Sequence, residues 1–327
     1  MFFKKGVIIA CLLIMAACYW YQLVIETGTN KEKIVKRIWT HVQKVYNSRY
    51  MSDLPKDISS IQEKRIQHLQ KMCIEYRKSK EYKHPTLIHN LFYIKNLTFP
   101  PSQTTNRALW CPCFKAGHSS WINTLQELNA NNSGFKFDLR ENINKTLTTV
   151  RFINVRDPWE RLLSAYSNRM TYQENSKYIS RQRNTIGRRI MSRYYPDSNA
   201  MNIPYENISF TFKDFLRFII DEPKQLSGRL DDHWVQYYEW CRPCDPYLDY
   251  NAIVKLETVT EDSNYVLEKI GVKTKIKDGP RKTAKYLQEQ YKEVPHWIID
   301  DLTKIFYWDF KLFDYDMNSP LVRKSIS

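Results

Sequence analysis

The stretch Thr149–Arg169, TVRFINVRDPWERLLSAYSNR, decides the fold because it joins a strand signal directly to a helix signal. Its first part is rich in β-branched and apolar residues, which predicts a buried strand over Thr148–Val155. Asp157 and Pro158 follow, and these residue types are favoured as the N-cap and the first residue of a helix. We therefore predict a helix over Pro158–Met170.

The helix part carries one apolar stripe and a serine outside it. The stripe consists of Trp159, Leu162, Leu163 and Tyr166. Ser164 lies roughly 140° around the helix from Trp159, and Arg156 closes the strand, where ligands of open α/β sheets gather. A guanidinium there can bind a phosphate through two hydrogen bonds, and the hydroxyl can complete the site. The alternative is a solvated serine and a surface ion pair between Arg156 and Glu160.

A second strand–turn–helix unit precedes this stretch. RALWCPCF, Arg107–Phe114, predicts a buried strand, and KAGHSSWINTLQEL, Lys115–Leu128, predicts a turn followed by a helix. Small residues in such a turn present backbone N–H groups beside a helix N-terminus, and Lys115 could neutralise an anion bound there. The alternative is a surface turn with an incidental lysine. The sequence contains no Walker A pattern, so the usual phosphate loop of ATP and GTP hydrolysis is absent.

A third unit lies downstream. YNAIVKLET, Tyr250–Thr258, predicts a strand, and Thr258 with Glu261 can form a capping box for a helix over residues 260–271. Alternation of strands and helices predicts an α/β fold with a largely parallel sheet.

Charge and the N-terminus restrict the partners. The formal net charge of +15 favours polyanions such as nucleic acid, anionic lipid, acidic glycans or phosphorylated cofactors. Gly6–Ile25 is a 20-residue segment without a charged side chain, long enough to span ~30 Å of hydrocarbon. Lys4 and Lys5 precede it, so we predict a cytosolic tail of residues 1–5 and a signal anchor. A cleaved signal peptide and a lipoprotein site at Cys18 are the alternatives.

The anchor predicts a lumenal body. We expect a stem and N-terminal helical region over residues 26–100, and a catalytic domain over residues 101–327. The sequons for N-glycosylation begin at Asn96, Asn131, Asn144 and Asn207. An anchor and sequons do not fit nucleic-acid binding, which we therefore do not expect.

Five cysteines lie outside the predicted anchor. They are Cys73, Cys111, Cys113, Cys241 and Cys244. An oxidising lumen would allow disulfides among them, and the odd number leaves at least one unpaired within a monomer. The alternative is a zinc site formed by the C-x-C and C-x-x-C pairs.

The first two units together resemble the donor-binding motifs of Golgi carbohydrate sulfotransferases. FKAGHSSW, Phe114–Trp121, is similar to their 5′-phosphosulfate loop, and RDPWERLLSAY, Arg156–Tyr166, is similar to their 3′-phosphate motif. The pattern is that of the branch with chondroitin 4-O-, dermatan 4-O- and HNK-1 sulfotransferases. It continues in order through the blocks Asp232–Asp262 and Ile305–Asp316.

The resemblance implies a P-loop nucleotide-kinase-like α/β fold with a central parallel sheet. It implies 3′-phosphoadenosine 5′-phosphosulfate (PAPS) as sulfate donor, a glycosaminoglycan hydroxyl as acceptor, no metal, and a Golgi membrane location. The acceptor most often found in the branch is position 4 of N-acetylgalactosamine in chondroitin. The residues implied to surround the 5′-phosphosulfate are Phe114, Lys115, Ala116, Gly117, His118, Ser119, Ser120 and Trp121. Arg156 and Ser164 are implied to bind the 3′-phosphate.

Some positions match this family and others depart from it. Cys111, Cys241 and Cys244 match its cysteines, whereas Cys113 is additional. Phe114 stands where the family usually has proline, and His118 where many members have cysteine.

Two residues are candidates for the chemistry itself. Lys115 would stabilise the bridging oxygen as the bond to sulfate breaks. His233, in DDHW, is the preferred general base for the acceptor hydroxyl, and His118 is the second candidate. A purely structural role is the alternative for His233.

A basic segment would steer an anionic acceptor. Its cations are Lys177, Arg181, Arg183, Arg188, Arg189 and Arg193. The alternative is a mobile basic loop. Two rival functions remain: a type II glycosyltransferase using Asp314-Tyr315-Asp316 as a D-x-D metal motif, and a non-catalytic glycan-binding relative.

Overall fold

A computed structural model describes residues 57–82, 91–96, 107–130, 135–138, 150–171, 183–223, 230–272, 274–276 and 286–318. Residues 58–327 form one compact unit. The predicted tail and anchor, residues 1–25, lie outside the described ranges. Within those ranges no helix has both the length and the apolar character needed to cross a membrane.

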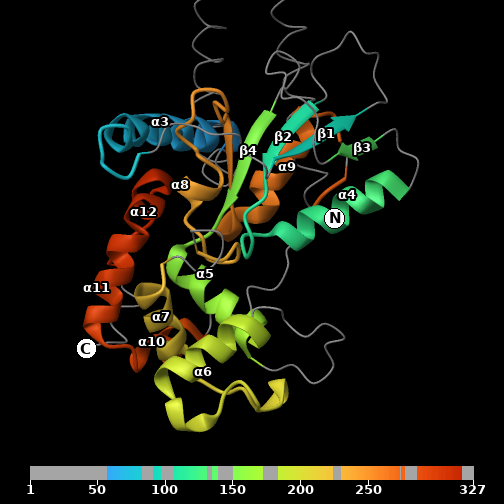
Figure 1. The fold of residues 1–327 in the computed structure, drawn as a ribbon. Helices are drawn as coiled ribbons and strands as arrows, with labels where there is room; N and C mark the ends of the chain where they lie inside the picture. The colour runs from blue at the N-terminus through green and yellow to red at the C-terminus, as the bar shows by residue number, and fades with distance from the viewer. Residues whose placement is uncertain are drawn as a thin grey trace, which may run out of the picture. The chain divides into compact units, whose positions relative to one another are not determined.

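The centre of the compact unit is a five-stranded sheet with the strand order β3-β1-β2-β4-β5 (Figure 1). The strands are β1 (Phe92–Asn96), β2 (Arg107–Cys111), β3 (Phe135–Asp138), β4 (Val150–Val155) and β5 (Ala252–Lys255). β2, β4 and β5 are parallel, whereas β1 pairs antiparallel with both β2 and β3. The α/β prediction is confirmed, but a largely parallel sheet holds only for three strands. β1 lies in the region predicted as stem, so its pairing was missed.

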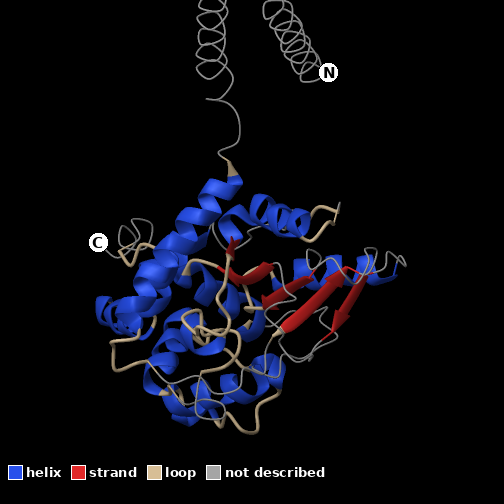
Figure 2. Ribbon diagram, turned by 90° about the horizontal axis from the view of Figure 1, so that it is seen from above, coloured by secondary structure: helices blue, strands red, loops and turns tan. Residues whose placement is uncertain are grey.

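Helices cover both faces of this sheet (Figure 2). The α-helices are α3 (Ile58–Tyr76), α4 (His118–Ala130), α5 (Pro158–Ala165), α6 (Arg188–Tyr194), α7 (Phe212–Asp221), α8 (Tyr237–Trp240), α9 (Val259–Lys269), α10 (Leu287–Lys292), α11 (His296–Ile305) and α12 (Tyr307–Phe313). Alternate strand residues enter opposite cores: Ile153 packs with α3, α5 and α7, and Phe152 packs with α4 and α9. Burial on both faces explains why these strands are almost continuously apolar.

The stretch that opened the sequence analysis forms the predicted strand and helix with shorter bounds. Asp157 caps α5 as predicted, because its Oδ1 accepts a hydrogen bond from the backbone N of Glu160 at 3.0 Å, and Pro158 is the first helical residue. The α-helix ends at Ala165, and residues Tyr166–Met170 form a π-helical turn, η3. The predicted helix to Met170 is therefore correct in extent, but its last turn has a different geometry.

The predicted capping box at Thr258 is wrong. A short 3₁₀ turn, η7 (Leu256–Thr258), follows β5, and the Thr258 side chain caps no backbone N–H of α9. The Thr258 hydroxyl donates instead to Asp262 Oδ2 at 2.7 Å, and Asp262 also accepts from the backbone N of Lys255 at 3.0 Å. The carboxylate one turn further along competes successfully for the hydroxyl.

Helix α3 belongs to the compact unit, although the sequence placed its residues in a stem. The side-chain amide of Gln62 accepts from the backbone N of Ile253 and donates to the carbonyl of Ile253, both at 2.9 Å. One side chain thus satisfies the edge of β5 in the way a neighbouring strand would. Arg65 adds an ion pair with buried Asp262 at 2.7 Å. The compact unit therefore starts at Ile58 and includes part of the predicted stem and N-terminal helical region.

Two disulfides hold this arrangement. Cys73 on α3 is bonded to Cys244, and Cys111 at the end of β2 is bonded to Cys241. The alternative of a zinc site is wrong, because three of its four thiols are consumed in these bonds. Cys113 keeps a buried thiol whose Sγ lies 3.3 Å from Cys241 Sγ, and burial raises its pKa.

Replacing Cys73 by serine is expected to lower the free energy of unfolding by about 2–5 kcal/mol, because the bond closes a long loop of the unfolded chain. The pair is separated by 171 residues. Urea unfolding of the variant and of the unmodified protein measures the difference. Equal stabilities would contradict a structural role of α3. Cys113→Ser serves as the matched control, because it removes a thiol without opening a disulfide.

Candidate active site

The β2–α4 loop, residues 112–117, is held by side chains of the β4–α5 segment. Three consecutive carbonyl groups of the loop accept hydrogen bonds from buried side chains. The pairs are Phe114 O with Arg161 Nε (3.2 Å), Lys115 O with Arg156 Nη1 (3.3 Å) and Ala116 O with Asn154 Nδ2 (3.2 Å). The carbonyls are therefore turned toward the protein, and the loop has one fixed shape.

The backbone of this loop suits an anion. Lys115 has φ +68° and Gly117 has φ +87°, the left-handed conformations that occur in anion-binding nests. α4 begins immediately afterwards at His118, and the first N–H groups of a helix lack intrahelical acceptors. A Cβ on Gly117 would meet Leu256, Asn154 and Val259 at ordinary contact distances, so the backbone conformation rather than space selects glycine.

Asn154 was not identified from the sequence, although it lies within the stretch that opens the analysis. Its side chain is fully buried in β4, and its Oδ1 accepts from Trp110 Nε1 at 2.7 Å while its Nδ2 donates to Ala116. Both ends of the amide are thus satisfied, and its orientation is fixed. An asparagine in an otherwise apolar buried strand is the signal that could have revealed it.

Lys115, Arg156 and Arg169 bring three positive charges together. The Nζ of Lys115 donates to Asn168 Oδ1 at 2.9 Å. Burial, together with the charges of Arg169 and Arg156, lowers the pKa of Lys115 to about 8. Cations that disfavour one another's charge in a partly buried place form a site for an anion.

The ion pair of Arg156 with Glu160, which was the alternative to phosphate binding, is formed, but it is buried rather than on the surface. The guanidinium donates to Glu160 Oε2 at 3.0 and 3.3 Å, and the Arg156 side chain is 4% exposed. The ion pair therefore orients Arg156 beside the loop. Ser164 is the one residue of α5 that is not fully buried. The donor-binding roles of Ser164, Ser119 and Ser120 stay predictions.

Two histidines flank Phe114. The ring of Phe114 lies 4.7 Å from that of His118 and 4.7 Å from that of His233, measured between centroids. The two positions that depart from the family pattern, Phe114 and His118, therefore pack against each other, and Phe114 also packs against the candidate base. Trp121, which was assigned to the donor loop, is fully buried in the core under the sheet, where its ring packs against Trp110.

His233 has the geometry of a general base. Its Nδ1 is 2.8 Å from Asp231 Oδ1, which fixes the ring and leaves Nε2 as the basic nitrogen in the neutral form. Burial lowers the pKa of His233, and the hydrogen bond and charge of Asp231 oppose this effect. Burial lowers the pKa of His118 to about 4, and the charges of His233 and Arg169 act in the same direction. Asp231, two residues before the histidine, was missed by the sequence analysis.

A buried cluster connects this site to the C-terminal block. Arg161 is 2% exposed, donates to the carbonyl of Val235 at 2.6 Å and lies 4.3 Å from the ring centroid of Tyr237. The hydroxyl of Tyr237 accepts from the backbone N of Arg156 at 2.9 Å, and Asp309 on α12 accepts from the N of Tyr237 at 2.9 Å. Burial raises the pKa of Asp309 to about 7. The strand end that carries Arg156 is thereby fixed to α8 and α12.

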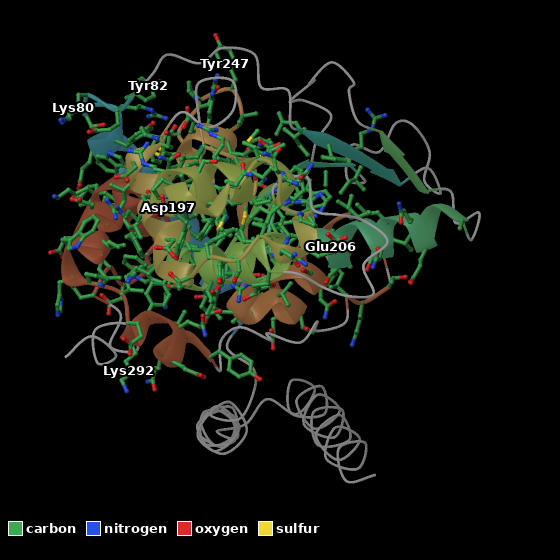
Figure 3. All side chains as sticks on the ribbon, turned by 60° about the horizontal axis from the view of Figure 1, so that its bottom comes forward. Lys80, Tyr82, Asp197, Glu206, Tyr247 and Lys292 are labelled. Atoms are coloured by element: carbon green, nitrogen blue, oxygen red, sulfur yellow. A yellow bond between two sulfur atoms is a disulfide. The ribbon has the colours of Figure 1, made fainter. Side chains whose placement is uncertain are left out.

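The four arginines of the basic segment that the structure describes all have partners within the fold. Arg183 is buried and donates to the carbonyls of Met170 and Ile208, and Arg188 donates to the carbonyl of Ala200 at 2.6 Å. Arg189 and Arg193 form ion pairs with Glu222 at 2.7 and 3.0 Å. Lys177 and Arg181 lie outside the described residues. Other charged side chains, such as those of Lys80 and Lys292, are exposed and project from the surface (Figure 3).

Comparison with known proteins decides the family. The model of the Sulfotransferase family matches residues 102–316. The chain belongs to the sulfotransferase family. The resemblance found in the sequence is confirmed, and the α/β architecture with parallel strands between helices fits this family. The finer assignment to a P-loop nucleotide-kinase-like arrangement stays a prediction, since no solved structure matches the chain significantly.

Several relatives of this sulfotransferase are carbohydrate sulfotransferases. It is 30% identical to carbohydrate sulfotransferase 11 of Mus musculus over 51% of its own length and 47% of that protein. It is 26% identical to carbohydrate sulfotransferase 9 of Homo sapiens over 89% of its own length and 71% of that protein. It is 28% identical to carbohydrate sulfotransferase 10 of Xenopus laevis over 64% and 65% of the two chains. The match to carbohydrate sulfotransferase 11 thus spans about half of that relative.

Metal ligands were also considered for the sulfotransferase. Among the residues that the structure describes, no group of three or more His, Cys, Asp or Glu side chains could hold a metal ion. Asp314 ends α12 with φ +52°, and both Asp314 and Asp316 are exposed. The independence of the reaction from metal stays a prediction.

Proposed function

We propose that this chain is a carbohydrate sulfotransferase that uses PAPS as donor. The observation that carries the proposal is the convergence of Lys115, Arg156 and Arg169 on a clamped loop with left-handed backbone, next to a histidine oriented by a carboxylate. Three cations and free helix N–H groups fit a donor with several negative charges. Membership of the sulfotransferase family and the names of the relatives support the same activity.

The described residues fit the donor, which supplies the sulfuryl group for transfer. Lys115 and the β2–α4 loop would hold the 5′-phosphosulfate, and Lys115 would neutralise the charge that develops on the bridging oxygen. Arg156, already oriented by Glu160, would hold the 3′-phosphate. His233 would accept the proton of the attacking hydroxyl through Nε2, while Asp231 stabilises the resulting imidazolium. Positioning and charge stabilisation then supply most of the rate enhancement.

The acceptor that we propose is a glycosaminoglycan, with position 4 of N-acetylgalactosamine in chondroitin as the first candidate. Its support is the resemblance of four sequence blocks to the chondroitin, dermatan and HNK-1 branch. The exposed faces of Arg189 and Arg193 could still attract an anionic chain, although Glu222 and Asp221 offset their charges.

The location that we propose is the Golgi membrane, with residues 6–25 as a type II anchor and the catalytic domain in the lumen. The two disulfides support an oxidising compartment. Asn207 is exposed, as N-glycosylation requires, and Asn96 ends β1. Asn131 and Asn144 lie outside the described residues, and modification at all four sites stays a prediction.

Replacing Arg156 by alanine is expected to weaken binding of 3′-phosphoadenosine 5′-phosphate (PAP) by about 10²-fold, because a bidentate charge pair is lost. Adenosine 5′-phosphosulfate lacks the 3′-phosphate, so its affinity should change much less. Calorimetric titration of both nucleotides measures the difference. The double variant Arg156→Ala with Glu160→Gln is the control, since it removes the acid that the single change leaves unpaired. Equal losses for both nucleotides would contradict the assignment of Arg156.

Transfer of radiolabelled sulfate from PAPS to a panel of desulfated glycans, with disaccharide analysis of the product, tests the reaction and identifies the acceptor. Binding of PAP without any transfer would favour a non-catalytic relative. Absence of PAP binding together with sugar transfer from a nucleotide sugar would favour a glycosyltransferase.

A further inference from the structure

The π-helical turn η3 carries Asn168 and Arg169, to which the proposed mechanism has given no separate role in the transfer step. It continues directly from α5, because its N-terminal neighbour Ala165 still has helical backbone angles. π-helical turns are rare in proteins as a whole, but those that occur are frequently found at functional sites. A π turn contains more residues than an α turn, so the side chains within and after it point in different directions from those of a continued α-helix. Asn168 and Arg169 lie in this turn.

Asn168 brings η3 against the β2–α4 loop. Its Oδ1 accepts the hydrogen bond from Lys115 Nζ at 2.9 Å. The Lys115 amine is thus held by a neutral oxygen and lies among positive charges. An amide oxygen holds the amine without neutralising it, so the positive charge of Lys115 stays available to an anion.

Arg169 follows Asn168 directly in η3, so the contact between Asn168 and Lys115 brings the turn that carries Arg169 to the β2–α4 loop. The charge of Arg169 contributes to lowering the pKa of Lys115, of His118 and of His233. Arg156 is held by its buried partner Glu160, whereas Arg169 belongs to the turn that holds the Lys115 amine.

The guanidinium of Arg169 has an unused donor. Its Nε is buried and has no hydrogen-bond partner within the described part of the chain, and no ion pair of Arg169 is formed there. Two carboxylates of the candidate site already have partners, Glu160 in Arg156 and Asp231 in His233. A buried N–H donor among cations indicates a missing acceptor, and an anion would supply one.

We propose that Arg169 binds the oxygens of the sulfuryl group during transfer, and that Asn168 is a positioning residue that holds the Lys115 amine at the bridging oxygen. The inference rests on the proposed function. In the transfer, the bond from sulfur to the bridging oxygen breaks and that oxygen keeps the electron pair. A bond from sulfur to the acceptor oxygen forms, and the hydroxyl proton goes to His233. Arg169, next to the residue that holds the Lys115 amine, stabilises the sulfuryl oxygens between these two events.

The test compares PAPS, which carries the sulfuryl group, with PAP, which lacks it. Arg169→Met is expected to weaken PAPS binding by about tenfold or more, to change PAP binding by less than about threefold, and to lower the single-turnover transfer rate by about 10²-fold. Arg169→Lys should recover part of the rate. Arg217→Met is the matched control, because Arg217 is an exposed arginine of α7 that pairs with Asp221.

Each outcome separates the inference from the proposed function. If the unmodified protein binds neither nucleotide, the proposed function fails. If it binds both and Arg169→Met weakens PAP and PAPS equally, Arg169 is a phosphate-binding residue and the inference fails. A change confined to the KM for the glycan, or no change in any measurement, would also overturn it.

The role of Asn168 has its own readout. Asn168→Asp would pair Lys115 with a carboxylate and raise the pKa of the amine above about 8. The pH at which PAP affinity begins to fall should therefore move upward, while PAP affinity at neutral pH decreases because the new carboxylate competes with the ligand. An unchanged pH dependence would show that Asn168 does not position Lys115.

Discussion

Replacement of Lys115 by methionine is expected to lower the rate of sulfate transfer by about 10²–10³-fold, because one preorganised charge at the leaving oxygen is lost. The loop should keep its shape in this variant. The hydrogen bonds that hold it reach the backbone carbonyls of Phe114, Lys115 and Ala116 rather than the lysine side chain. Single-turnover transfer from PAPS measures the effect, and circular dichroism checks the fold.

The pH dependence of binding separates this lysine from an ordinary surface lysine. Burial and the charges of Arg169 and Arg156 lower the pKa of Lys115 to about 8, so the free protein loses this positive charge as the pH rises above about 8. The phosphates of PAP are fully ionised there, since their second pKa is about 6. PAP affinity is therefore expected to fall through this range.

Lys115→Arg is the matched control for that pH dependence. A guanidinium stays charged throughout this range, so PAP affinity in the variant should no longer fall near pH 8. Calorimetric titrations from pH 7 to about 9.5 compare the two proteins. A profile for the unmodified protein that is flat to pH 9.5 would contradict the convergence of cations on Lys115.

The sequence predicted the elements of the site because each element has a local signature. Asp157 and Pro158 mark the start of α5, and the buried strands before Arg156 and before the β2–α4 loop are apolar runs. Parallel strands end at one edge of the sheet, so the candidate segments that follow β2 and β4 can meet there. The hydrogen bond from Arg156 to the carbonyl of Lys115 shows that they do.

The support of the site could not be predicted because it consists of contacts between distant residues. Nothing near Asn154 in the sequence indicates that its amide links Trp110 to Ala116, and nothing near Arg161 indicates its bond to Phe114. Periodicity placed Ser164 outside the apolar stripe, and Ser164 is the one residue of α5 that is not fully buried. Glu160 and Arg161, which also lie outside the stripe, are nevertheless buried. A helix in the centre of a unit does not show the one-sided pattern of a surface helix.

The attachment of the predicted N-terminal helical region to the sheet could not be seen in the sequence for a similar reason. The helix Ile58–Tyr76 is rich in polar residues and has a weak apolar pattern, which is typical of a stem. Its attachment depends instead on polar groups: Gln62 at the edge of β5, Arg65 with Asp262, and the bond of Cys73 to Cys244. Such attachments depend on specific partners rather than on hydrophobic periodicity, so a sequence pattern does not show them.

Replacement of His233 by asparagine is expected to lower the transfer rate by about 10²–10⁴-fold with little change in PAP affinity. The structure favours His233 over His118 as base because Asp231 orients its ring and opposes the lowering of its pKa by burial, whereas the pKa of His118 is lowered to about 4. A base with a pKa nearer the working pH accepts a proton more effectively. His296→Asn, on the exposed start of α11, is the matched control.

The acid side of the pH–rate profile identifies the base. A general base acts in its neutral form, and the pKa of His233 lies below its ordinary value of 6.5, so the rate should rise with pH below that value and then level off. Beyond this plateau the rate should fall again near pH 8, because Lys115 loses its positive charge there. His233→Asn should abolish the rising limb of the profile and keep the falling one. Asp231→Asn should weaken the base and reduce the rate. His118→Asn should keep both limbs. If the rising limb persists in His233→Asn and disappears in His118→Asn, the base is His118.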